Sequence, residues 1–527
     1  MKDNLPRDFT VRCAHAYPAK TAYVDGDRSL TWGELHERSD RLAGALQALG
    51  VRKGDVVALL AHDHMELVEH WHACLKLGAL RTAINYRYAP REIAHILSDS
   101  NARVLLVEDD LIPVLERCLE ELDGPPPVLV GIGSSDGLEL DYERLLAAAD
   151  EPRLPYLRET DHAAISYTSG TTGMPKGALF TQRSLREALT WMPLNVGLRH
   201  EDVWANALPA PGAPMVFTAA NASNGMTCVL PDGRFRPSRF LELVSEQRIT
   251  STIVVPTMLA QLLQELETGD YDTSSLRLVC YGSMPSTPAL ITAAREAFGC
   301  ELQQWYGATE TTAGPTVILR DSDHQRGLAG EPELLTSCGV PQPQIELDVR
   351  SEDGTSLPAG QVGEVWMRGP TIFDGYLNRP RETAEVMVGE WLRPGDLGRL
   401  DAEGRLYLVD RKKFMIISGG YNVFPVVVEN VLAEHPAIHE AAVVGAPHPH
   451  WGEAVVAVVA LRPGAAAGPE EIVEYCAERV GKWEVPKHVL IVDELPKGAT
   501  AKIQKHEIRE WFRSDPARLP WHEVPTA

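Results

Sequence analysis

Short apolar runs alternate with amphipathic segments along most of the chain. The runs at 104–107, 253–255 and 276–281 have the length of buried strands, and the last two are closed by Pro256 and Gly282. Between such runs, apolar residues recur at helical spacing. An alternation of strands and helices is typical of layered α/β proteins. We therefore expect a large N-terminal region with an α/β fold.

The segment from Gly33 to Leu49 predicts a helix that begins with a recognisable cap. Its leucines at 35, 42, 46 and 49 recur at near-helical spacing. Thr31 precedes it and Glu34 follows three residues later. This pair can form a capping box, in which each side chain bonds the backbone N–H of the other residue.

The pattern changes after about residue 340. Asp353-Gly354 and Glu403-Gly404 are turn dipeptides between segments that look like strands, as in antiparallel hairpins. We expect residues 340–410 to form a β-rich part of the N-terminal region.

The last part of the chain has the pattern of a compact α+β domain. Residues 441–444 and 454–461 are apolar enough for buried strands, and Pro469 opens an amphipathic segment. We expect an N-terminal domain at 1–410 and a small C-terminal domain at 411–527.

Composition limits the classes of partner. A chain of 527 residues is too long for one ordinary core. Its net charge of −23 disfavours general binding to nucleic acid or anionic membrane. The eight cysteines form no Cys-x-x-Cys pair, and no apolar run reaches the length of a membrane span. These features, with no apolar signal region at the start, lead us to expect a cytoplasmic protein.

Residues 167–177 carry the strongest chemical signal. They read Tyr-Thr-Ser-Gly-Thr-Thr-Gly-Met-Pro-Lys-Gly, and their small hydroxyl, glycine and lysine residues are Thr168, Ser169, Gly170, Thr171, Thr172, Gly173 and Lys176. Small residues let backbone N–H groups surround an anion, and lysine adds a positive charge. The lysine is followed by glycine, so the segment is not a Walker P-loop. A plain surface turn is the structural alternative.

This string resembles the signature of the adenylate-forming superfamily, which includes acyl-CoA synthetases, nonribosomal peptide adenylation domains and beetle luciferases. In appearance the chain is closest to bacterial fatty-acid or aryl-acid CoA ligases. The resemblance implies that residues 168–176 hold the β- and γ-phosphates of ATP. It also implies an N-terminal domain of several subdomains and a C-terminal domain that moves during the reaction, in which a carboxylate is joined to AMP and pyrophosphate leaves.

Residues 306–310, Tyr-Gly-Ala-Thr-Glu, match the second motif of this superfamily. By resemblance, Tyr306 stacks on adenine, Thr309 contacts the α-phosphate and Glu310 binds Mg²⁺, a cation that prefers oxygen ligands. Gly282 and Ser283 correspond to a turn that borders the adenine and the acyl pocket.

The resemblance assigns further residues after position 390. Asp396 would bind the ribose hydroxyls, Arg411 would contact the nucleotide, and Lys413 would lie at the hinge between the domains. Gly419 and Gly420 would let the pantetheine arm of CoA pass. Lys502 would stabilise charge during adenylation, whereas Lys505 is expected at the surface.

The stretch 208–214 departs from many acyl-CoA synthetases, because Gly212 stands where they have an aromatic residue or histidine. Asn221, Ser223 and Asn224 are polar where relatives are often apolar. We interpret both features as favouring an aryl or other non-simple acid over a plain alkyl chain.

The sequence thus predicts ATP-dependent, AMP-forming activation of a carboxylic acid followed by transfer to CoA, with ATP, Mg²⁺ and CoA as cofactors. Two alternative reactions would use the same fold and ATP: diazotisation of an aryl amine with nitrite, and loading of a carrier protein. A third is an inactive relative that only binds nucleotide or acid. Assembly into a homo-oligomer stays open.

Overall fold

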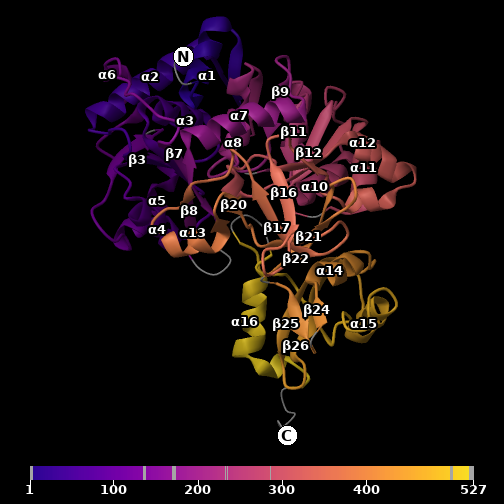
Figure 1. The fold of residues 1–527 in the computed structure, drawn as a ribbon. Helices are drawn as coiled ribbons and strands as arrows, with labels where there is room; N and C mark the ends of the chain where they lie inside the picture. Colours follow the sequence, from indigo (N-terminus) through magenta and orange to yellow (C-terminus); the bar gives the residue numbers. More distant parts are fainter. Residues whose placement is uncertain are drawn as a thin grey trace. The chain divides into compact units, whose positions relative to one another are not determined.

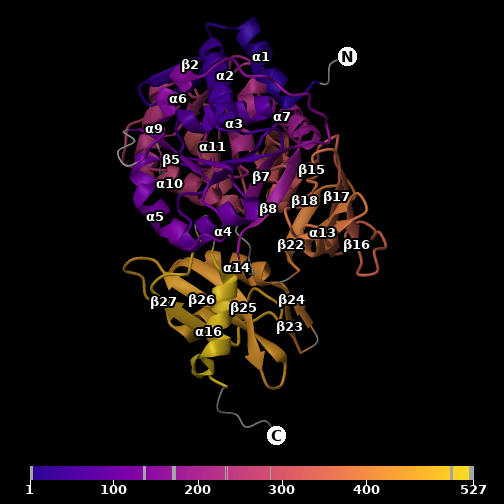
Figure 2. The same ribbon diagram turned by 90° about the vertical axis from the view of Figure 1, so that its left-hand side faces the viewer.

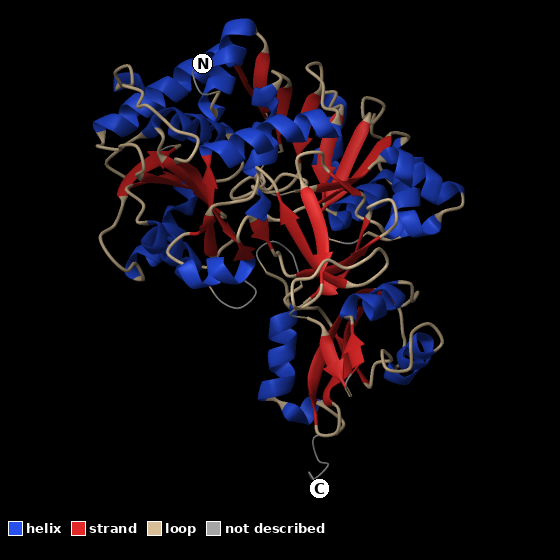
Figure 3. Ribbon diagram, in the orientation of Figure 1, coloured by secondary structure: helices blue, strands red, loops and turns tan. Residues whose placement is uncertain are grey.

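The computed structural model describes residues 4–521 except 134–137, 169–173, 232, 234, 285, 413, 420 and 499–502. The chain divides into two compact units, coloured along the sequence in Figure 1. The N-terminal unit contains Met1–Thr168, Met174–Leu347 and Met367–Leu392. The C-terminal unit contains mainly Asp348–Trp366 and Arg393–Ala527. Helices and strands alternate through most of the N-terminal unit, as Figure 3 shows, which confirms the α/β prediction.

One sheet of the N-terminal unit, sheet B, has a parallel centre and an antiparallel edge. Strand β7 runs parallel to β4 but antiparallel to β8, and β8 is antiparallel to β18. In spatial order the strands are β18 (Gly375–Tyr376), β8 (Lys176–Thr181), β7 (His162–Thr168), β4 (Leu80–Ile84), β3 (Val56–Leu60), β5 (Val104–Glu108) and β6 (Val128–Ile132).

The second sheet of this unit, sheet A, is parallel from β13 through β1 and antiparallel at both edges. Two of its strands, β11 and β12, match the apolar runs at 253–255 and 276–281. In spatial order the strands are β15 (Val340–Pro341), β14 (Val317–Leu319), β13 (Glu301–Tyr306), β12 (Leu278–Gly282), β11 (Ser251–Val254), β9 (Val203–Asn206), β10 (Thr227–Leu230), β1 (Thr21–Asp25) and β2 (Arg28–Thr31).

Helix α3 (Met65–Leu77) joins the two sheets. It contacts β1 of sheet A and both β3 and β4 of sheet B, and all of its residues are buried. Burial lowers the pKa of His70 and of His72 to about 3, so both imidazoles are neutral in the folded chain. The sequence of this helix is therefore less apolar than its full burial requires, because polar residues such as His70 and His72 interrupt the apolar pattern.

The other α-helices of the N-terminal unit flank the sheets. Helix α2 has the predicted capping box: Thr31 Oγ1 accepts the Glu34 N–H at 3.2 Å, and a Glu34 carboxylate oxygen accepts the Thr31 N–H at 2.8 Å. These helices are α1 (Pro6–Ala16), α2 (Trp32–Ala48), α4 (Pro90–Ser100), α5 (Ile112–Glu120), α6 (Tyr142–Ala148), α7 (Gln182–Val196), α8 (Met215–Thr218), α9 (Pro237–Glu246), α10 (Pro256–Leu266), α11 (Pro288–Phe298), α12 (Asp321–Ala329) and α13 (Pro380–Val386).

The predicted β-rich region corresponds to sheet C. The turn at Glu403-Gly404 joins antiparallel β21 and β22, as expected. The turn at Asp353-Gly354 leads only to a single bridge between Arg350 and Ser356. The strands are β19 (Met387–Val388), β20 (Trp391–Leu392), β17 (Gly363–Arg368), β21 (Asp396–Leu400) and β22 (Leu406–Arg411), with β16 (Glu346–Arg350) beside β17.

The C-terminal residues form sheet D with helices on both faces. On strand β26 (Gly452–Leu461), Val455, Ala457 and Val459 belong to the core shared with α14 (Pro425–Ala433) and α15 (Pro469–Ala477). Val456 and Val458 belong to the core shared with α16 (Lys505–Ser514). This alternation is the period of two expected for a strand covered on both sides. Figure 2 shows α16 against β25 (Ile438–His448), with β26 beside it.

The elements of this region confirm the predicted strands and the helix from Pro469. They are β23 (Ile416–Ser418), β24 (Tyr421–Val423), α14 (Pro425–Ala433), β25 (Ile438–His448), β26 (Gly452–Leu461), α15 (Pro469–Ala477), β27 (His488–Val492) and α16 (Lys505–Ser514). Throughout the described residues, no helix has the length and apolarity needed to span a membrane.

Candidate active site

Two antiparallel strands flank the glycine- and hydroxyl-rich segment. Thr168 is the last residue of β7 and Lys176 the first of β8, and the two are paired in register. The Thr168 hydroxyl lies 3.5 Å from the Lys176 carbonyl oxygen. One strand thus leads into the segment and another leads out of it. Ser169, Gly170, Thr171, Thr172 and Gly173 lie outside the described residues.

Tyr376 connects the lysine of this segment to the acidic residue of the second motif. The Lys176 ammonium lies 5.5 Å from the centre of the Tyr376 ring, within the range of a cation–π contact. The Tyr376 hydroxyl donates to Glu310 Oε1 at 2.5 Å. A lysine, a phenol and a carboxylate from three distant segments thus meet, and an anion and a cation can both be bound beside them.

The sequence reasoning missed Tyr376. Its only local signal is the dipeptide Gly375-Tyr376, which carries no chemistry by itself. Strand β18 pairs with β8, so that Tyr376 lies opposite Ala178. Only this long-range pairing brings the phenol to Lys176.

Gly282 is the last residue of β12 and Ser283 follows it, next to the end of β13. Gly282 is opposite Trp305, and a Cβ at Gly282 would lie 2.3 Å from the Trp305 carbonyl oxygen. Only glycine fits that approach. Ser283 has a φ of +69°, in the left-handed region that costs a non-glycine residue energy. Tyr306 is the last residue of β13, so the two motifs lie at the carboxyl ends of neighbouring strands of sheet A.

The turn after Tyr306 is held under strain. Thr309 and Glu310 lie in the 3₁₀ turn Thr309–Thr311, and the next two residues, Thr312 and Ala313, have φ of 55° and 57°. The Glu310 carbonyl accepts the Phe373 N–H at 2.9 Å. Strained backbone of this kind clusters at functional sites.

Asp396 and Arg411 form a second cluster, in the C-terminal unit. They are opposite each other on β21 and β22, and Arg411 Nε lies 2.6 Å from Asp396 Oδ1. Asp396 is buried, whereas about half of the Arg411 side chain is exposed. Gly395, just before Asp396, has a φ of +82°, which glycine tolerates. A buried carboxylate beside an exposed guanidinium suits a ligand with hydroxyl and phosphate groups.

The glycine pair after β23 is described in part. Gly419, with a φ of +58°, turns the chain between β23 and β24 and donates its N–H to the Trp451 carbonyl at 3.0 Å. A Cβ there would lie 3.3 Å from Trp451 Cδ1. Gly420, Lys413 and Lys502 lie outside the described residues.

Lys505 differs from expectation. Its ammonium lies 2.7 Å from Glu429 Oε1, and both side chains are largely buried. Burial raises the pKa of Glu429, and the ammonium opposes that rise. Lys505 is therefore a structural partner of α14, and its prediction as a surface lysine is wrong.

Gly212 has a conformational reason to be glycine. Its φ is +93°, and its carbonyl faces the buried Arg81 guanidinium at 3.5 Å. A Cβ at this position would meet only Ser166 Oγ, at 3.8 Å. Space is therefore available, but an L-residue there would be strained.

The three polar residues after Gly212 are engaged within the fold. Asn221 bonds Tyr23 and the Ala22 carbonyl, and Ser223 donates to the Ala220 carbonyl. Asn224 donates to the Leu198 carbonyl at 3.3 Å. These bonds account for the polarity of the three residues, which therefore gives no reason to expect a polar acid.

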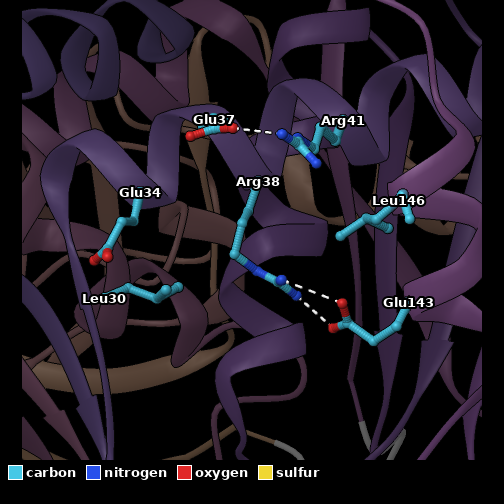
Figure 4. Close-up of a pocket in the computed structure, with 8 residues that line it drawn as sticks. Leu30, Glu34, Glu37, Arg38, Arg41, Glu143 and Leu146 are labelled. Atoms are coloured by element: carbon cyan, nitrogen blue, oxygen red, sulfur yellow. Dashed lines mark hydrogen bonds and ion pairs between the residues drawn. The ribbon is translucent and has the colours of Figure 1, made fainter.

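A surface hollow of about 270 Å³ between α2 and α6 contains none of the motif residues. Figure 4 shows two ion pairs in this hollow: Arg38 with Glu143, and Arg41 with Glu37. Arg38 also pairs with the buried Glu69. Because both arginines of the hollow are engaged in ion pairs within the fold, we interpret it as part of the packing between the two helices.

Comparisons with known proteins agree with the two motifs and the fold. The family described as AMP-binding enzyme matches residues 11–377, and the AMP-binding enzyme C-terminal domain matches residues 427–502. The chain therefore belongs to the AMP-binding enzyme family, as the sequence resemblance predicted.

Three relatives show how far the similarity extends. A fatty acid–[acyl-carrier-protein] ligase, ScoC of Streptomyces coeruleorubidus, is 33% identical, over 95% of each chain. A feruloyl-CoA synthase of Amycolatopsis sp is 34% identical, over 96% of this chain and 98% of the relative. The structure of O-succinylbenzoate coenzyme A synthetase (MenE) from Bacillus subtilis, in complex with ATP and magnesium ion, has a TM-score of 0.83 at 31% identity, covering 95% of this chain and 98% of that one.

Proposed function

We propose that this enzyme activates a carboxylic acid with ATP, releasing pyrophosphate, and then transfers the acyl group from AMP to CoA. The observation that carries the proposal is the meeting of Lys176, Tyr376 and Glu310 at the edge of the glycine- and hydroxyl-rich segment. A cationic and an anionic side chain joined by one phenol can bind a polyphosphate and its cation together. Membership of the AMP-binding enzyme family supports the same reaction.

The proposed nucleotide contacts follow the motifs. Thr168, Lys176 and the segment Ser169–Gly173 hold the β- and γ-phosphates, Tyr306 stacks on adenine, and Thr309 contacts the α-phosphate. Gly282 and Ser283 border the base, while Asp396 and Arg411 bind the ribose and the nucleotide. Glu310 has the hard oxygen donors that Mg²⁺ prefers, and the ion would neutralise phosphate charge there.

The proposed second step uses the domain at 411–527, separate from the domain at 1–410. Lys502 stabilises charge at the α-phosphate during adenylation. After the domain moves, the turn at Gly419 and Gly420 admits the pantetheine arm. Glycine suits such a close approach, and Trp451 already limits the space beside Gly419.

For the acid we propose an aryl or other non-simple carboxylic acid. Two observations support this class: the absence of a side chain at Gly212, and the similarity to a feruloyl-CoA synthase. The similarity to ScoC, a ligase that acts on an acyl carrier protein by its name, favours carrier-protein loading as the second candidate.

Pyrophosphate release tests the first step. Purified enzyme is assayed with ATP, Mg²⁺ and a panel of aryl, cinnamyl and fatty acids. Lys502→Ala should abolish release but leave thioester formation from supplied acyl-AMP intact, because its charge serves only the attack on the α-phosphate. The exposed Lys482→Ala is the matched control. Equal loss of both half-reactions would contradict the role of Lys502, and no release with any acid would contradict the proposed function.

The acceptor is tested on an acid that supports release. CoA, a phosphopantetheinylated carrier protein, and nitrite with an amino-substituted aryl acid are added separately. A CoA thioester and faster AMP release are expected. A product with the carrier protein alone would establish the second candidate, and ATP use that depends on nitrite would establish diazotisation.

A further inference from the structure

Metal-ligating side chains gather at the carboxyl ends of two neighbouring strands, outside all the motifs above. His62 and His64 lie between β3 and α3, and Glu108 is the last residue of β5. Strands β3 and β5 are parallel and adjacent, with Leu60 opposite Val107. The ends of parallel strands meet at one edge of the sheet, so residues far apart in sequence come together there.

The three side chains have the spacing of a metal site. Their ligand atoms all lie within 4.8 Å of one another. His62 Nδ1 is 2.9 Å from Glu108 Oε2, and His64 Nε2 is 3.5 Å from Glu108 Oε1. Ligands of a tetrahedral zinc ion, with bonds of about 2.0–2.1 Å, lie about 3.3 Å apart. Each histidine thus already lies near one oxygen of Glu108, and small movements of the three side chains would bring one ligand atom from each to this spacing.

Asp25 orients one of these histidines. Its Oδ1 lies 3.4 Å from His64 Nδ1, so that His64 Nε2 faces Glu108. Asp25 is itself fixed, because its Oδ2 accepts the Met65 N–H at 3.0 Å and pairs with Arg28. A carboxylate on the far nitrogen of a metal-ligating histidine is a common supporting contact, which fixes the ring and its tautomer.

The cluster is open to solvent. A cavity of about 190 Å³ is lined by His64, Glu108 and Gly133, among others. The exposed fractions of the side chains are 22% for His62, 35% for His64 and 17% for Glu108. An ion can enter, and water or Asp110, whose Oδ2 is 3.8 Å from His62 Nδ1, can complete its coordination.

We propose that His62, His64 and Glu108 bind one divalent transition-metal ion, with Zn²⁺ preferred. Two imidazoles and a carboxylate are typical zinc ligands, whereas Mg²⁺ and Ca²⁺ prefer oxygen alone. The ion is separate from the Mg²⁺ proposed at Glu310. It ties the loop after β3 to the end of β5 and thereby stabilises the N-terminal unit.

The competing account gives Glu108 a purely structural role. Its Oε2 also accepts the His62 N–H at 2.7 Å, a bond that holds the loop without any metal. Glu108→Gln separates the accounts, because the amide oxygen can keep this bond but is a weaker metal ligand. The exposed Glu116→Gln on α5 is the matched control.

Equilibrium dialysis of the full-length, chelator-treated protein against ZnCl₂ tests the proposal, with zinc measured by elemental analysis. We expect about one ion per chain, a higher melting temperature with zinc, and little effect of Mg²⁺. The double variant His62→Gln/His64→Gln and the single variant Glu108→Gln should each bind at least about tenfold more weakly, and Glu116→Gln should bind normally. Unchanged binding in the folded Glu108→Gln protein overturns the proposal.

Cobalt spectroscopy tests whether cysteine thiolates bind the ion instead of these three residues. All eight cysteines are buried, but thiolates are strong zinc ligands. Co²⁺ bound to two imidazoles and a carboxylate should give visible bands without a thiolate charge-transfer band in the near ultraviolet. A thiolate band, or cobalt spectra that are the same in wild type and in the double variant, overturns the assignment to these residues.

Discussion

The two proposed nucleotide-binding clusters are built in different ways. In the C-terminal unit, Asp396 and Arg411 are opposite residues of one antiparallel strand pair, joined by an ion pair of 2.6 Å. In the N-terminal unit, Lys176, Tyr376 and Glu310 come from three segments up to 200 residues apart. The first cluster is set by one local ladder, and the second by the order of strands in sheet B and a strained turn.

This difference indicates which substitutions should disturb each cluster. The β21–β22 ladder keeps Asp396 and Arg411 opposite each other even when one side chain is changed. Glu310 instead depends on a neighbouring phenol and on a turn with two left-handed residues. We therefore expect substitutions in the N-terminal cluster to change both the Mg²⁺ dependence and the rate of pyrophosphate release. Substitutions in the C-terminal pair should mainly weaken nucleotide binding.

The largest effect is expected for Glu310→Gln. A neutral amide is a poorer ligand for a hard cation, and we expect kcat/KM for ATP to fall about 100-fold, or about 2.7 kcal/mol. Pyrophosphate release measured against Mg²⁺ concentration should shift to higher Mg²⁺. The exposed Glu333→Gln is the control and should behave as wild type. An unchanged Mg²⁺ dependence would remove Glu310 from the cation site.

A smaller effect is expected for Asp396→Asn. The amide can still accept one hydrogen bond but loses the charge that binds Arg411 and strengthens bonds to ribose hydroxyls. We expect KM for ATP to rise about tenfold with little change in kcat, as for lost binding that is equal in ground and transition states. Steady-state kinetics check this, with the exposed Asp493→Asn as control. A fall in kcat alone would contradict the proposed affinity role.

The smallest effect is expected for Tyr376→Phe. This change removes the hydroxyl that bonds Glu310 and keeps the ring against Lys176. The loss of one such bond is worth about 1 kcal/mol, or about fivefold in kcat/KM. Tyr271→Phe removes a similar bond, 2.7 Å from the Tyr271 hydroxyl to Glu265, away from the motifs and should leave the kinetics unchanged. Equal kinetics for the two variants would show that Tyr376 only supports the fold.

Much of this protein is determined locally and was predictable from sequence. The capping box at Thr31 and Glu34 depends on residues three apart, and the strands at 441–444 and 454–461 depend on runs of apolar residues. The family motifs were also found from sequence, because short loops between strands keep their chemistry in consecutive residues. The roles of all the motif residues, Lys502 and Gly420 among them, stay predictions.

Tertiary structure decided what depends on distant neighbours. The phenol of Tyr376 reaches Glu310 because β18 pairs with β8, which no local pattern around Gly375 indicates. Lys505 is an internal ion-pair partner because α14 supplies Glu429. His62, His64 and Glu108 converge because β3 and β5 are neighbours in sheet B. Local sequence specifies which helices and strands form. Which side chains meet depends on the order of the strands and on the packing between segments, because burial of the apolar residues of the whole chain selects both together.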